Sequence, residues 1–321
     1  MPRLLLTGAN GFVGKILTPR LQRHGFHVTA VSGTNIADQS TADVQVVCDI
    51  NDAHSLAAVV RETAPTHVVH LAAVSHVPTS FIQPLQTWQT NVMGSLNLLE
   101  AIRTHAPNAF VLFSSSSEVY GGAFQLGEPV NEDTQCLPLN PYAASKVAAE
   151  SAFREYFRQG LDGVIARPFN HIGAHQSHDF VTASFARQIA LIEADKQAPI
   201  LKVGNLDARR DFLDVQDVCS AYLALLDLTG NTEYPRCLNI ASGHSRRIGE
   251  MLDALLAQSI VQIDVQLDPA RLRPSDIPVA AGNSDALRKA TNWQPAVPIE
   301  KTLSELLDYW RKKICHEAII S

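Results

Sequence analysis

A glycine-rich turn near the start of the chain restricts the possible folds more than any other feature. Residues 3–7 form a short apolar run, which is typical of a buried parallel strand. The run leads directly into a GxxGxxG pattern made by Gly8, Gly11 and Gly14. A helix is predicted to follow, and then a second strand over residues 28–31. Strand, glycine turn, helix and strand in this order predict the first unit of a dinucleotide-binding fold, with an ordinary tight turn as the alternative.

The three glycines have different predicted roles. Gly8 allows the tight turn, and Gly11 lets a pyrophosphate approach the N–H groups at the start of the helix. Gly14 allows the helix to pack closely on the sheet.

The end of the second strand bears on the choice of cofactor. An acidic residue there would accept hydrogen bonds from the ribose hydroxyls of NAD. Residues 32–35 read Ser-Gly-Thr-Asn, so no carboxylate is present to repel a 2′-phosphate, and no arginine is present to bind one. Ser32 and Gly33 are therefore placed in the cofactor site, and we expect NADP(H) to be preferred, with NAD(H) as the alternative.

Apolar runs continue to alternate with helical patterns as far as residue 170. Further strands are predicted over residues 44–48, 67–71, 109–113 and 163–167, and a long helix over 87–104. This alternation predicts an α/β fold with a doubly wound parallel Rossmann sheet, followed by a smaller C-terminal α/β substrate domain. Ligands of such sheets bind beyond the C-terminal strand ends. The residues expected there are Asp49, Ile50, Leu71, Ala72, Ala73, Ser114 and Pro168.

Tyr142 and Lys146 form a Tyr-x-x-x-Lys pattern in a predicted helix. Residues four apart lie on the same helix face. A lysine cation near a phenol favours the phenolate and is expected to lower the tyrosine pKa from about 10, which suits proton transfer to or from a carbonyl or alcohol oxygen. Taken alone, the same pattern also fits a surface helix.

The order of the motifs along the whole chain resembles the extended short-chain dehydrogenase/reductase family. The matching segments are Thr7-Gly8-x-x-Gly11-x-x-Gly14, Asp49-Ile50, His70-Leu71-Ala72-Ala73, Asn91, Ser114–Gly121, Tyr142-x-x-x-Lys146 and Arg167-Pro168-x-Asn170. The resemblance implies that Tyr142 is the catalytic acid/base, that Lys146 assists it and that Ser116 hydrogen-bonds the substrate oxygen at C4. It also implies that Asn10, Phe12, Val13, Asn91, Tyr142 and Lys146 contact the cofactor.

Segments in the C-terminal half resemble the GDP-6-deoxy-4-keto-mannose reductases, which form GDP-D-rhamnose. They include residues 167–177, 201–206, 209–212 and 272–276. The resemblance implies NAD(P)H-dependent reduction of the C4 keto group of GDP-4-keto-6-deoxy-D-mannose, in deoxysugar and glycan precursor synthesis. The substrate contacts that it implies are Ser116, Glu118, Asn170, Val181, Lys202, Arg210 and Arg273. At residues 173–176 the chain reads Gly-Ala-His-Gln where these families usually have Gly-Pro-Gly-Gln, so the shape of this loop is left open.

Three other functions remain open at this point. The GDP-mannose 4,6-dehydratases share several segments, and their Thr-Ser-Glu resembles Ser116-Ser117-Glu118, which makes Glu118 a tentative catalytic base. A talose-forming C4 reductase would use the same catalytic residues. A non-catalytic NADP-sensing regulator is the third, although a sensor has no use for an intact Tyr142 and Lys146.

The resemblance also implies how the chain is divided and assembled. We expect an NAD(P)-binding Rossmann domain over residues 1–170 plus about 215–240, and a nucleotide-sugar-binding domain over 171–214 plus about 241–321. We expect a homodimer, with a tetramer as the alternative, formed through the helices that contain residues 91–104 and 141–159. Apolar residues of these helices suit either such a contact or the sheet: Leu98, Ile102, Ala148, Ala149, Ala152 and Phe153.

Composition narrows the remaining classes of function. The net charge is -6 with acidic and basic residues mixed along 321 residues, so a nucleic-acid partner is not expected. No apolar run is long enough to span a bilayer, and no signal peptide precedes the first strand. The five cysteines lack metal-ligand spacing. We therefore expect a cytoplasmic enzyme with no metal and no membrane partner.

Overall fold

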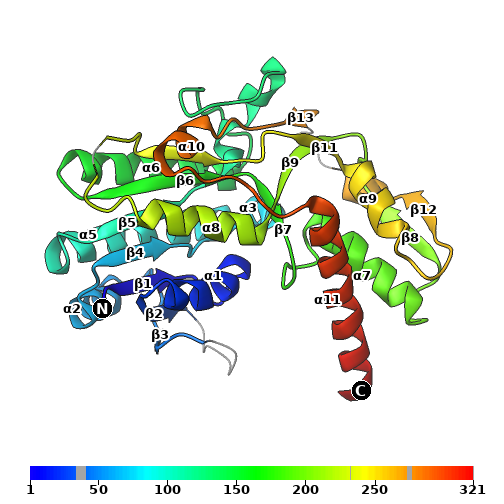
Figure 1. The fold of residues 1–321 in the computed structure, drawn as a ribbon, viewed down its shortest axis with the longest axis horizontal. Helices are drawn as coiled ribbons and strands as arrows, with labels where there is room; N and C mark the ends of the chain where they lie inside the picture. Colours follow the sequence, from blue (N-terminus) through cyan, green and yellow to red (C-terminus); the bar gives the residue numbers. More distant parts are fainter. Residues whose placement is uncertain (34–40, 232, 273–276, 321) are drawn as a thin grey trace.

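The computed structural model describes residues 1–33, 41–231, 233–272 and 277–320. Its largest part is a seven-stranded sheet (Figure 1) in which every neighbouring pair of strands is parallel. The chain order reverses between β1 and β4, and such switch points are where ligands bind in open α/β sheets. The predicted doubly wound sheet is confirmed. In spatial order its strands are β10 (Cys237–Ile240), β6 (Gly163–Pro168), β5 (Phe110–Ser114), β4 (His67–His70), β1 (Arg3–Thr7), β2 (His27–Ser32) and β3 (Val44–Val47).

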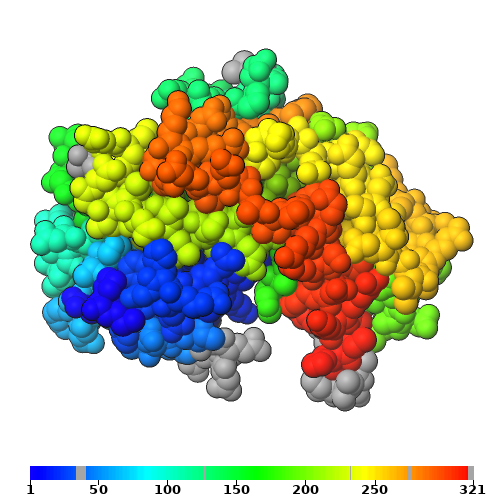
Figure 2. Space-filling model, viewed as in Figure 1, coloured from blue at the N-terminus to red at the C-terminus, as the bar shows by residue number. Residues whose placement is uncertain are grey.

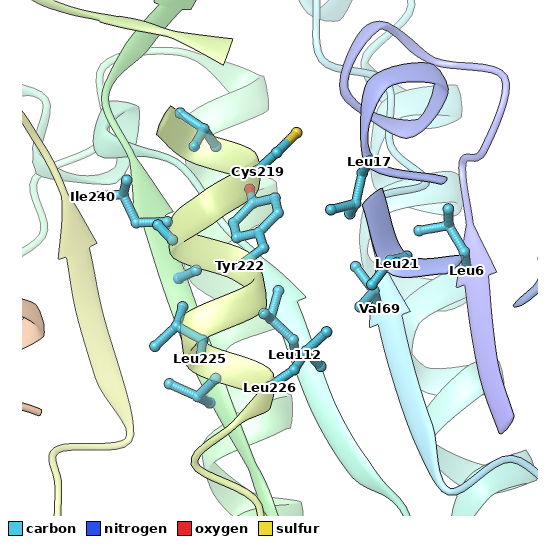
Figure 3. Close-up of a cluster of buried hydrophobic side chains, with 14 of the residues drawn as sticks. Leu6, Leu17, Leu21, Val69, Leu112, Cys219, Tyr222, Leu225, Leu226 and Ile240 are labelled. Carbon is cyan, nitrogen blue, oxygen red and sulfur yellow. The ribbon is translucent and has the colours of Figure 1, made fainter. Parts of the chain in front are cut away.

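Helices α1 (Phe12–Arg23) and α8 (Val215–Leu226) cover one face of the sheet. Leu17 and Leu21 of α1 and Tyr222 of α8 point into the apolar layer beneath them (Figure 3). The strands are apolar on both sides, as expected for a parallel sheet that is covered on both faces.

Helices α2 (Ala53–Thr63), α5 (Gly94–His105) and α6 (Pro141–Arg158) cover the opposite face. Asp52 caps α2, because its carboxylate accepts from the backbone N–H groups of His54 and Ser55. The sequence left open whether six apolar residues of two helices face a dimer contact or the sheet, and most of them pack in this core. Fully buried among them are Leu98, Ile102, Ala149 and Phe153.

The helix predicted over residues 87–104 is interrupted. It consists of α4 (Pro84–Trp88), a π-helical turn (Gln89–Met93) and α5. Asn91 lies in the π turn and its side chain bonds both backbone groups of Val74, which holds the turn against the β4 loop. Such turns occur where a side chain needs a position that a regular helix cannot give.

The C-terminal elements form a smaller part beside the C-terminal strand ends (Figure 1). Its core lies between α7 (Val181–Glu193), α9 (Ile248–Leu256) and α11 (Ile299–Ile320). One small sheet consists of β7 (Asn170–Ile172), β9 (Arg209–Asp214), β11 (Ser245–Arg247) and β13 (Val279–Ala280), and another pairs β8 (Ile200–Val203) with β12 (Asp264–Leu267).

One C-terminal segment packs on the large sheet instead. Leu287 of α10 (Asp285–Thr291) and Trp293 belong to the core beneath α8. The indole N–H of Trp293 is 2.9 Å from the Ser220 hydroxyl and 3.2 Å from the Asp217 carbonyl. The chain therefore returns to the large sheet a second time, beyond the return expected for residues 215–240. Among the described residues, no helix is both long and apolar enough to cross a membrane.

Candidate active site

A cavity of about 2050 Å³ lies beyond the C-terminal ends of β1, β4, β5 and β6. On the face seen in Figure 2, the surface is hollowed between the N-terminal part, in blue, and α11, in red. Eighteen of the predicted site residues line the cavity, although they come from distant parts of the chain. They are Gly8, Gly11, Phe12, Val13, Gly14, Leu71, Ala72, Ala73, Ser114, Ser116, Glu118, Tyr142, Lys146, Pro168, Asn170, Val181, Lys202 and Arg210.

Other predicted cofactor residues lie outside the wall of this cavity: Asn10, Ser32, Gly33, Asp49, Ile50 and Asn91. The Asn10 amide donates to the Ser32 hydroxyl at 2.8 Å, which ties the glycine turn to the end of β2. Ile50 is buried, and its side chain fills the space that a Cβ at Gly94 would need. Arg273, Thr34 and Asn35 lie outside the described residues.

The glycine turn fits the diphosphate of a dinucleotide. Gly8 has a φ of 74°, and a Cβ there would lie 2.7 Å from the backbone nitrogen of Ala72. Gly11 is the N-cap of α1 and has no side chain to cover the first N–H groups of the helix. Residues 12–15 carry no carboxylate that would repel an anion. An uncapped helix N-terminus that lines a cavity suits a phosphate group.

Tyr142 is held in place by the start of α6. Asn140 caps the helix by accepting from the backbone N–H of Ala143 at 2.8 Å, and Pro141 is the first helical residue. The backbone N–H of Tyr142 donates to the Ser80 hydroxyl at 3.2 Å. The tyrosine side chain consequently enters the cavity from a rigid helical turn.

The predicted lowering of the tyrosine pKa is wrong for this structure. Burial raises the pKa of Tyr142 to about 12, partly offset by a hydrogen bond with Ser116, while the negative charge of Glu118 raises it further. The phenol is therefore protonated at neutral pH, which is the state that a proton donor needs.

Lys146 lies four residues further along the same face of α6. Its ammonium group donates to the carbonyl of Ser114 at 2.8 Å and lies 4.8 Å from the centre of the Phe113 ring. Burial lowers the pKa of Lys146 to about 8, and the nearby charge of Glu150 opposes this decrease. The lysine thus carries its charge inside the protein, at the end of β5.

Ser116 and Glu118 follow β5 directly. The backbone N–H of Glu118 donates to the Ser116 hydroxyl oxygen at 3.2 Å. The Asn140 amide donates to the Glu118 carboxylate at 3.0 Å, so the residue that caps α6 also orients this carboxylate. A hydroxyl, a phenol and a carboxylate consequently meet at one end of the cavity.

Asn91 has a positioning role in the structure. It is 1% exposed, and its amide donates to the Ser145 hydroxyl at 2.9 Å, in addition to its bonds with Val74. Ser145 in turn donates to the carbonyl of Tyr142 at 2.7 Å. Asn91 therefore joins the loop after β4 to the turn of α6 that carries the tyrosine.

Four further residues predicted to bind substrate also line the cavity. Asn170, Lys202 and Arg210 come from β7, β8 and β9, and Val181 begins α7. Arg210 also donates to the carbonyls of Arg209 and Ile277 through one guanidinium nitrogen, which fixes its direction. The structure thus gathers two cations and a helix N-terminus in one wall of the cavity.

Residue His175 settles the loop shape that the sequence left open. Its φ is 73°, a left-handed conformation in which glycine is normally preferred. The loop therefore keeps the backbone of a glycine loop although a histidine occupies the position. The ring of His175 packs against Tyr309 of α11, with the ring centres 4.7 Å apart.

Several residues of the cavity were not predicted from the sequence. Gln176 is buried and lines the cavity, and within the described chain its side-chain oxygen has no hydrogen-bond partner. The Tyr222 hydroxyl is 2.8 Å from that of Ser114. His171, which follows the predicted contact Asn170, also lines the cavity, and its ring stacks on Phe12 and bonds the carbonyl of Phe169. Tyr222 is 80 residues from Tyr142 in the chain, and no local pattern marks it.

A family model described as GDP-mannose 4,6 dehydratase matches residues 5–306. This chain belongs to the GDP-mannose 4,6-dehydratase family. The GDP-6-deoxy-D-mannose reductase of Pseudomonas aeruginosa is 37% identical over 316 residues, which cover 98% of this chain and 99% of that protein. The GDP-6-deoxy-D-talose 4-dehydrogenase of Aggregatibacter actinomycetemcomitans is 29% identical over 289 residues, or 89% of this chain and 90% of that protein.

Two solved structures resemble this chain over nearly its whole length. The structure of RMD from Pseudomonas aeruginosa complexed with NADPH has a TM-score of 0.84 and 35% identity, covering 98% of this chain and 100% of that one. A putative epimerase from Burkholderia cenocepacia has a TM-score of 0.84 and 32% identity, covering 97% of this chain and 98% of that one. The resemblance to the extended short-chain dehydrogenases/reductases is confirmed.

Proposed function

We propose that this protein reduces the C4 keto group of GDP-4-keto-6-deoxy-D-mannose to give GDP-6-deoxy-D-mannose, which is GDP-D-rhamnose. The observation that carries the proposal is the meeting of Tyr142, Ser116 and Lys146 in one cavity, in a chain that matches a GDP-6-deoxy-D-mannose reductase over nearly its full length. When bound, NADPH supplies the hydride for C4.

The chain's own residues handle the proton. Tyr142 donates its phenolic proton to the C4 oxygen, where negative charge develops during reduction. With a pKa of about 12 the phenol is available as an acid across the physiological pH range. Ser116 hydrogen-bonds the same oxygen and so polarises the carbonyl, in the way that oxyanion-hole donors act.

Lys146 supports the donor. Once the proton has left Tyr142, a phenolate remains in a buried site, and a nearby ammonium group stabilises this charge. Lys146 is protonated below its pKa of about 8, so this support is present at neutral pH and is lost as the pH rises through that value. The carbonyl of Ser114 directs the ammonium group.

The preferred cofactor in this proposal is NADP(H), with NAD(H) as the alternative. The glycine turn and the open N-terminus of α1 suit the diphosphate, and Ser32 and Gly33 stand at the end of β2 without a carboxylate. The relative solved with NADPH supports the same choice.

Binding of the sugar nucleotide is assigned to residues of the C-terminal elements. Lys202, Arg210 and the N-terminus of α7 provide positive charge and N–H donors for a diphosphate. The proposed division follows: residues 1–170 with about 215–240 hold the cofactor, and residues 171–214 with about 241–321 hold the nucleotide sugar. Residues 285–293 are the exception, because they pack on the large sheet.

The decisive experiment is incubation with NADPH and GDP-4-keto-6-deoxy-D-mannose, followed by NMR of the product. Oxidation of NADPH together with the C4 proton couplings of the rhamno isomer is expected. If the product is the talo isomer, the protein is still a C4 reductase, but the proposed stereochemistry at C4 is wrong. Absence of any reduced sugar would reject the proposal, and NADPH binding without turnover would favour a sensor.

The geometry of Glu118 supports a second candidate, the 4,6-dehydration of GDP-mannose. Glu118 lines the cavity beside Ser116 and Tyr142, and a water elimination needs such a carboxylate as a base. Incubation with GDP-mannose and catalytic NADP⁺ tests this candidate. Formation of the 4-keto-6-deoxy sugar would show dehydratase activity, and unchanged GDP-mannose would exclude it.

For assembly, we propose a homodimer whose interface differs from the one the helices first suggested. Helices α3 (Val77–Ile82) and α4 expose large apolar side chains: Phe81 and Ile82 are 59% and 79% exposed, and Leu85 is 86% exposed. A contiguous apolar surface of this kind suits contact with a second copy. A cytoplasmic location is also proposed, since all five cysteines are free thiols.

A further inference from the structure

The helix that carries Tyr142 and Lys146 places a third ionisable residue in line with them. Glu150 follows Lys146 by four residues, so the three side chains lie on one face of α6. Glu150 lies outside the cavity wall, and its side chain is 3% exposed. A buried carboxylate thus stands one turn behind the lysine of the active site.

Glu150 makes a dense set of hydrogen bonds. One carboxylate oxygen accepts from the hydroxyl of Ser115 at 2.6 Å and from Nε of Arg167 at 2.8 Å. The other oxygen accepts from Nη2 of Arg167 at 2.6 Å. The arginine is equally buried, so this is a two-pronged ion pair inside the protein.

These bonds hold the segment that carries the substrate-polarising hydroxyl. Lys146 donates to the carbonyl of Ser114, and Glu150 accepts from the side chain of Ser115, the next residue. Ser116 follows immediately. Two buried charged residues of α6 therefore hold consecutive residues of one segment, and the position of Ser116 relative to Tyr142 depends on both bonds.

Arg167 is itself held from the far side. Its Nη1 donates to the hydroxyl of Tyr120 at 2.9 Å, and its guanidinium lies 4.8 Å from the centre of that ring. Tyr120 donates in turn to the side chain of Asn239 in β10 at 2.7 Å. The ion pair is consequently part of a network that joins α6, β6, the segment after β5 and β10.

Stability alone is a weak reason for such a pair, because apolar residues of similar volume often serve at least as well. We propose that Glu150 is a positioning residue, which acts as the buried counterion of Lys146 and holds the Ser114–Ser116 segment against α6, with Arg167 as its anchor. The inference rests on the proposed function, since it takes Tyr142, Ser116 and Lys146 as the reacting groups.

The charges around Lys146 determine what should be measured. Glu150 faces it on α6, and His70 of β4 lies on another side, neutral because burial lowers its pKa to about 3. Tyr142 is protonated, and two cations stand behind Glu150: Arg167, and Arg154 with its Nη2 3.6 Å from the Glu150 carboxylate. Removing the negative charge of Glu150 lowers the pKa of Lys146, whereas removing the positive charge of Arg167 raises it.

The two charge variants should therefore move the pH profile in opposite directions. In Glu150→Gln, the pH at which kcat declines on the alkaline side should fall by about one unit, and in Arg167→Met it should rise by a similar amount. A purely structural role predicts a different pattern. Both variants would lose activity and stability, and their pH profiles would not shift in opposite directions. Shifts in the same direction, or no shifts, would overturn the proposal.

Two further variants separate charge from position. Ser115→Ala breaks the tie to Glu150 without changing any charge, so kcat should fall about tenfold while the profile stays in place. Glu155→Gln makes the same chemical change as Glu150→Gln on the same helix, in an exposed ion pair with Arg158, and should leave both kcat and the profile unchanged. A Ser115→Ala variant with wild-type kcat would remove the positioning part of the proposal.

A measurement without turnover keeps the test independent of the proposed function. NMR titration of ¹³C-labelled lysine in the cofactor-free protein reports the pKa of Lys146 directly, and it should move downward in Glu150→Gln. If a single variant fails to fold, the pair Glu150→Gln with Arg167→Met removes both buried charges and should return the pKa of Lys146 toward that of the wild type. Inactive wild-type protein would count against the proposed function, whereas an unmoved lysine pKa would count against this inference.

Discussion

Replacing Tyr142 by phenylalanine removes one oxygen atom from the centre of the cavity. The side chain is 7% exposed, so the ring is packed and its shape is kept by the substitution. The backbone of this residue bonds Ser80 and Ser145, and Asn140 caps the helix through Ala143, so none of these bonds involves the phenolic oxygen. The variant consequently tests proton donation with little change in the surrounding structure.

The expected loss of activity follows from the role of the phenol. A positioned general acid contributes about 10²–10⁴-fold to a rate, which corresponds to about 3–5 kcal/mol of transition-state stabilisation. A pKa of about 12 means that almost every molecule carries the proton at pH 7, so the whole population of Tyr142 loses its function in the variant. Stability should change by no more than about 1 kcal/mol, because the lost bond with Ser116 is a single neutral hydrogen bond.

Steady-state kinetics with NADPH and GDP-4-keto-6-deoxy-D-mannose measures the effect, and fluorescence titration gives the affinity for NADPH. We expect kcat to fall by two to four orders of magnitude with the NADPH affinity within about threefold of the wild type. Tyr156→Phe is the matched control, since it removes a phenol of the same helix that bonds Glu100 at the surface. A Tyr142→Phe variant that keeps even a tenth of wild-type kcat would refute the assignment of the proton donor.

Four more outcomes are expected. Gly8→Ala should lose about 1–2 kcal/mol of stability and weaken NADPH binding at least about tenfold, because Gly8 has a φ of 74° and no room for a Cβ; unchanged melting and titration curves would contradict this. The kcat/KM with NADPH should exceed that with NADH, and the reverse order would show that the end of β2 was misinterpreted. Below about pH 6.5, His70 should contribute a fall of about 1.4 kcal/mol per pH unit to the free energy of unfolding, because it stays neutral in the fold, with a pKa of about 3, but becomes protonated when the chain unfolds; urea titrations at pH 7 and 5 should show a smaller pH dependence in His70→Gln than in the wild type. In light scattering, Leu85→Glu should convert the dimer to a monomer. Leu267→Glu, the matched change at another exposed apolar residue, should leave the dimer intact, and a dimer that persists in Leu85→Glu would rule out the α3–α4 surface.

Much of the fold could be predicted because its signals are local. The GxxGxxG turn after an apolar strand, the cap at Asp52 and the alternation of strands and helices each depend on a few neighbouring residues. The π turn at Asn91 could not be predicted, because it is stabilised by Val74, which is 17 residues away. The second return of the chain to the large sheet depends on Trp293 contacting α8, which is another long-range contact.

The residues that we propose as catalytic could be named from the sequence because their spacing and order along the chain resemble one family. Their ionisation states could not, because burial depends on the whole fold. The spacing of Tyr142 and Lys146 suggested a lowered tyrosine pKa, whereas desolvation in the folded protein raises it. Glu150 was not predicted as a functional residue, because a glutamate in a helix is normally at the surface and its burial depends on the whole fold.

The sequence by itself determined the type of sheet, and its resemblance to one family named the residues that we propose to react. The sheet follows from short local patterns, such as a glycine turn between an apolar strand and a helix. Only the tertiary structure decided which side chains are buried together and therefore which are charged. Coulomb and desolvation energies depend on distances between residues that are far apart in the chain, such as Glu150, Arg167 and Ser115, and no local pattern contains those distances.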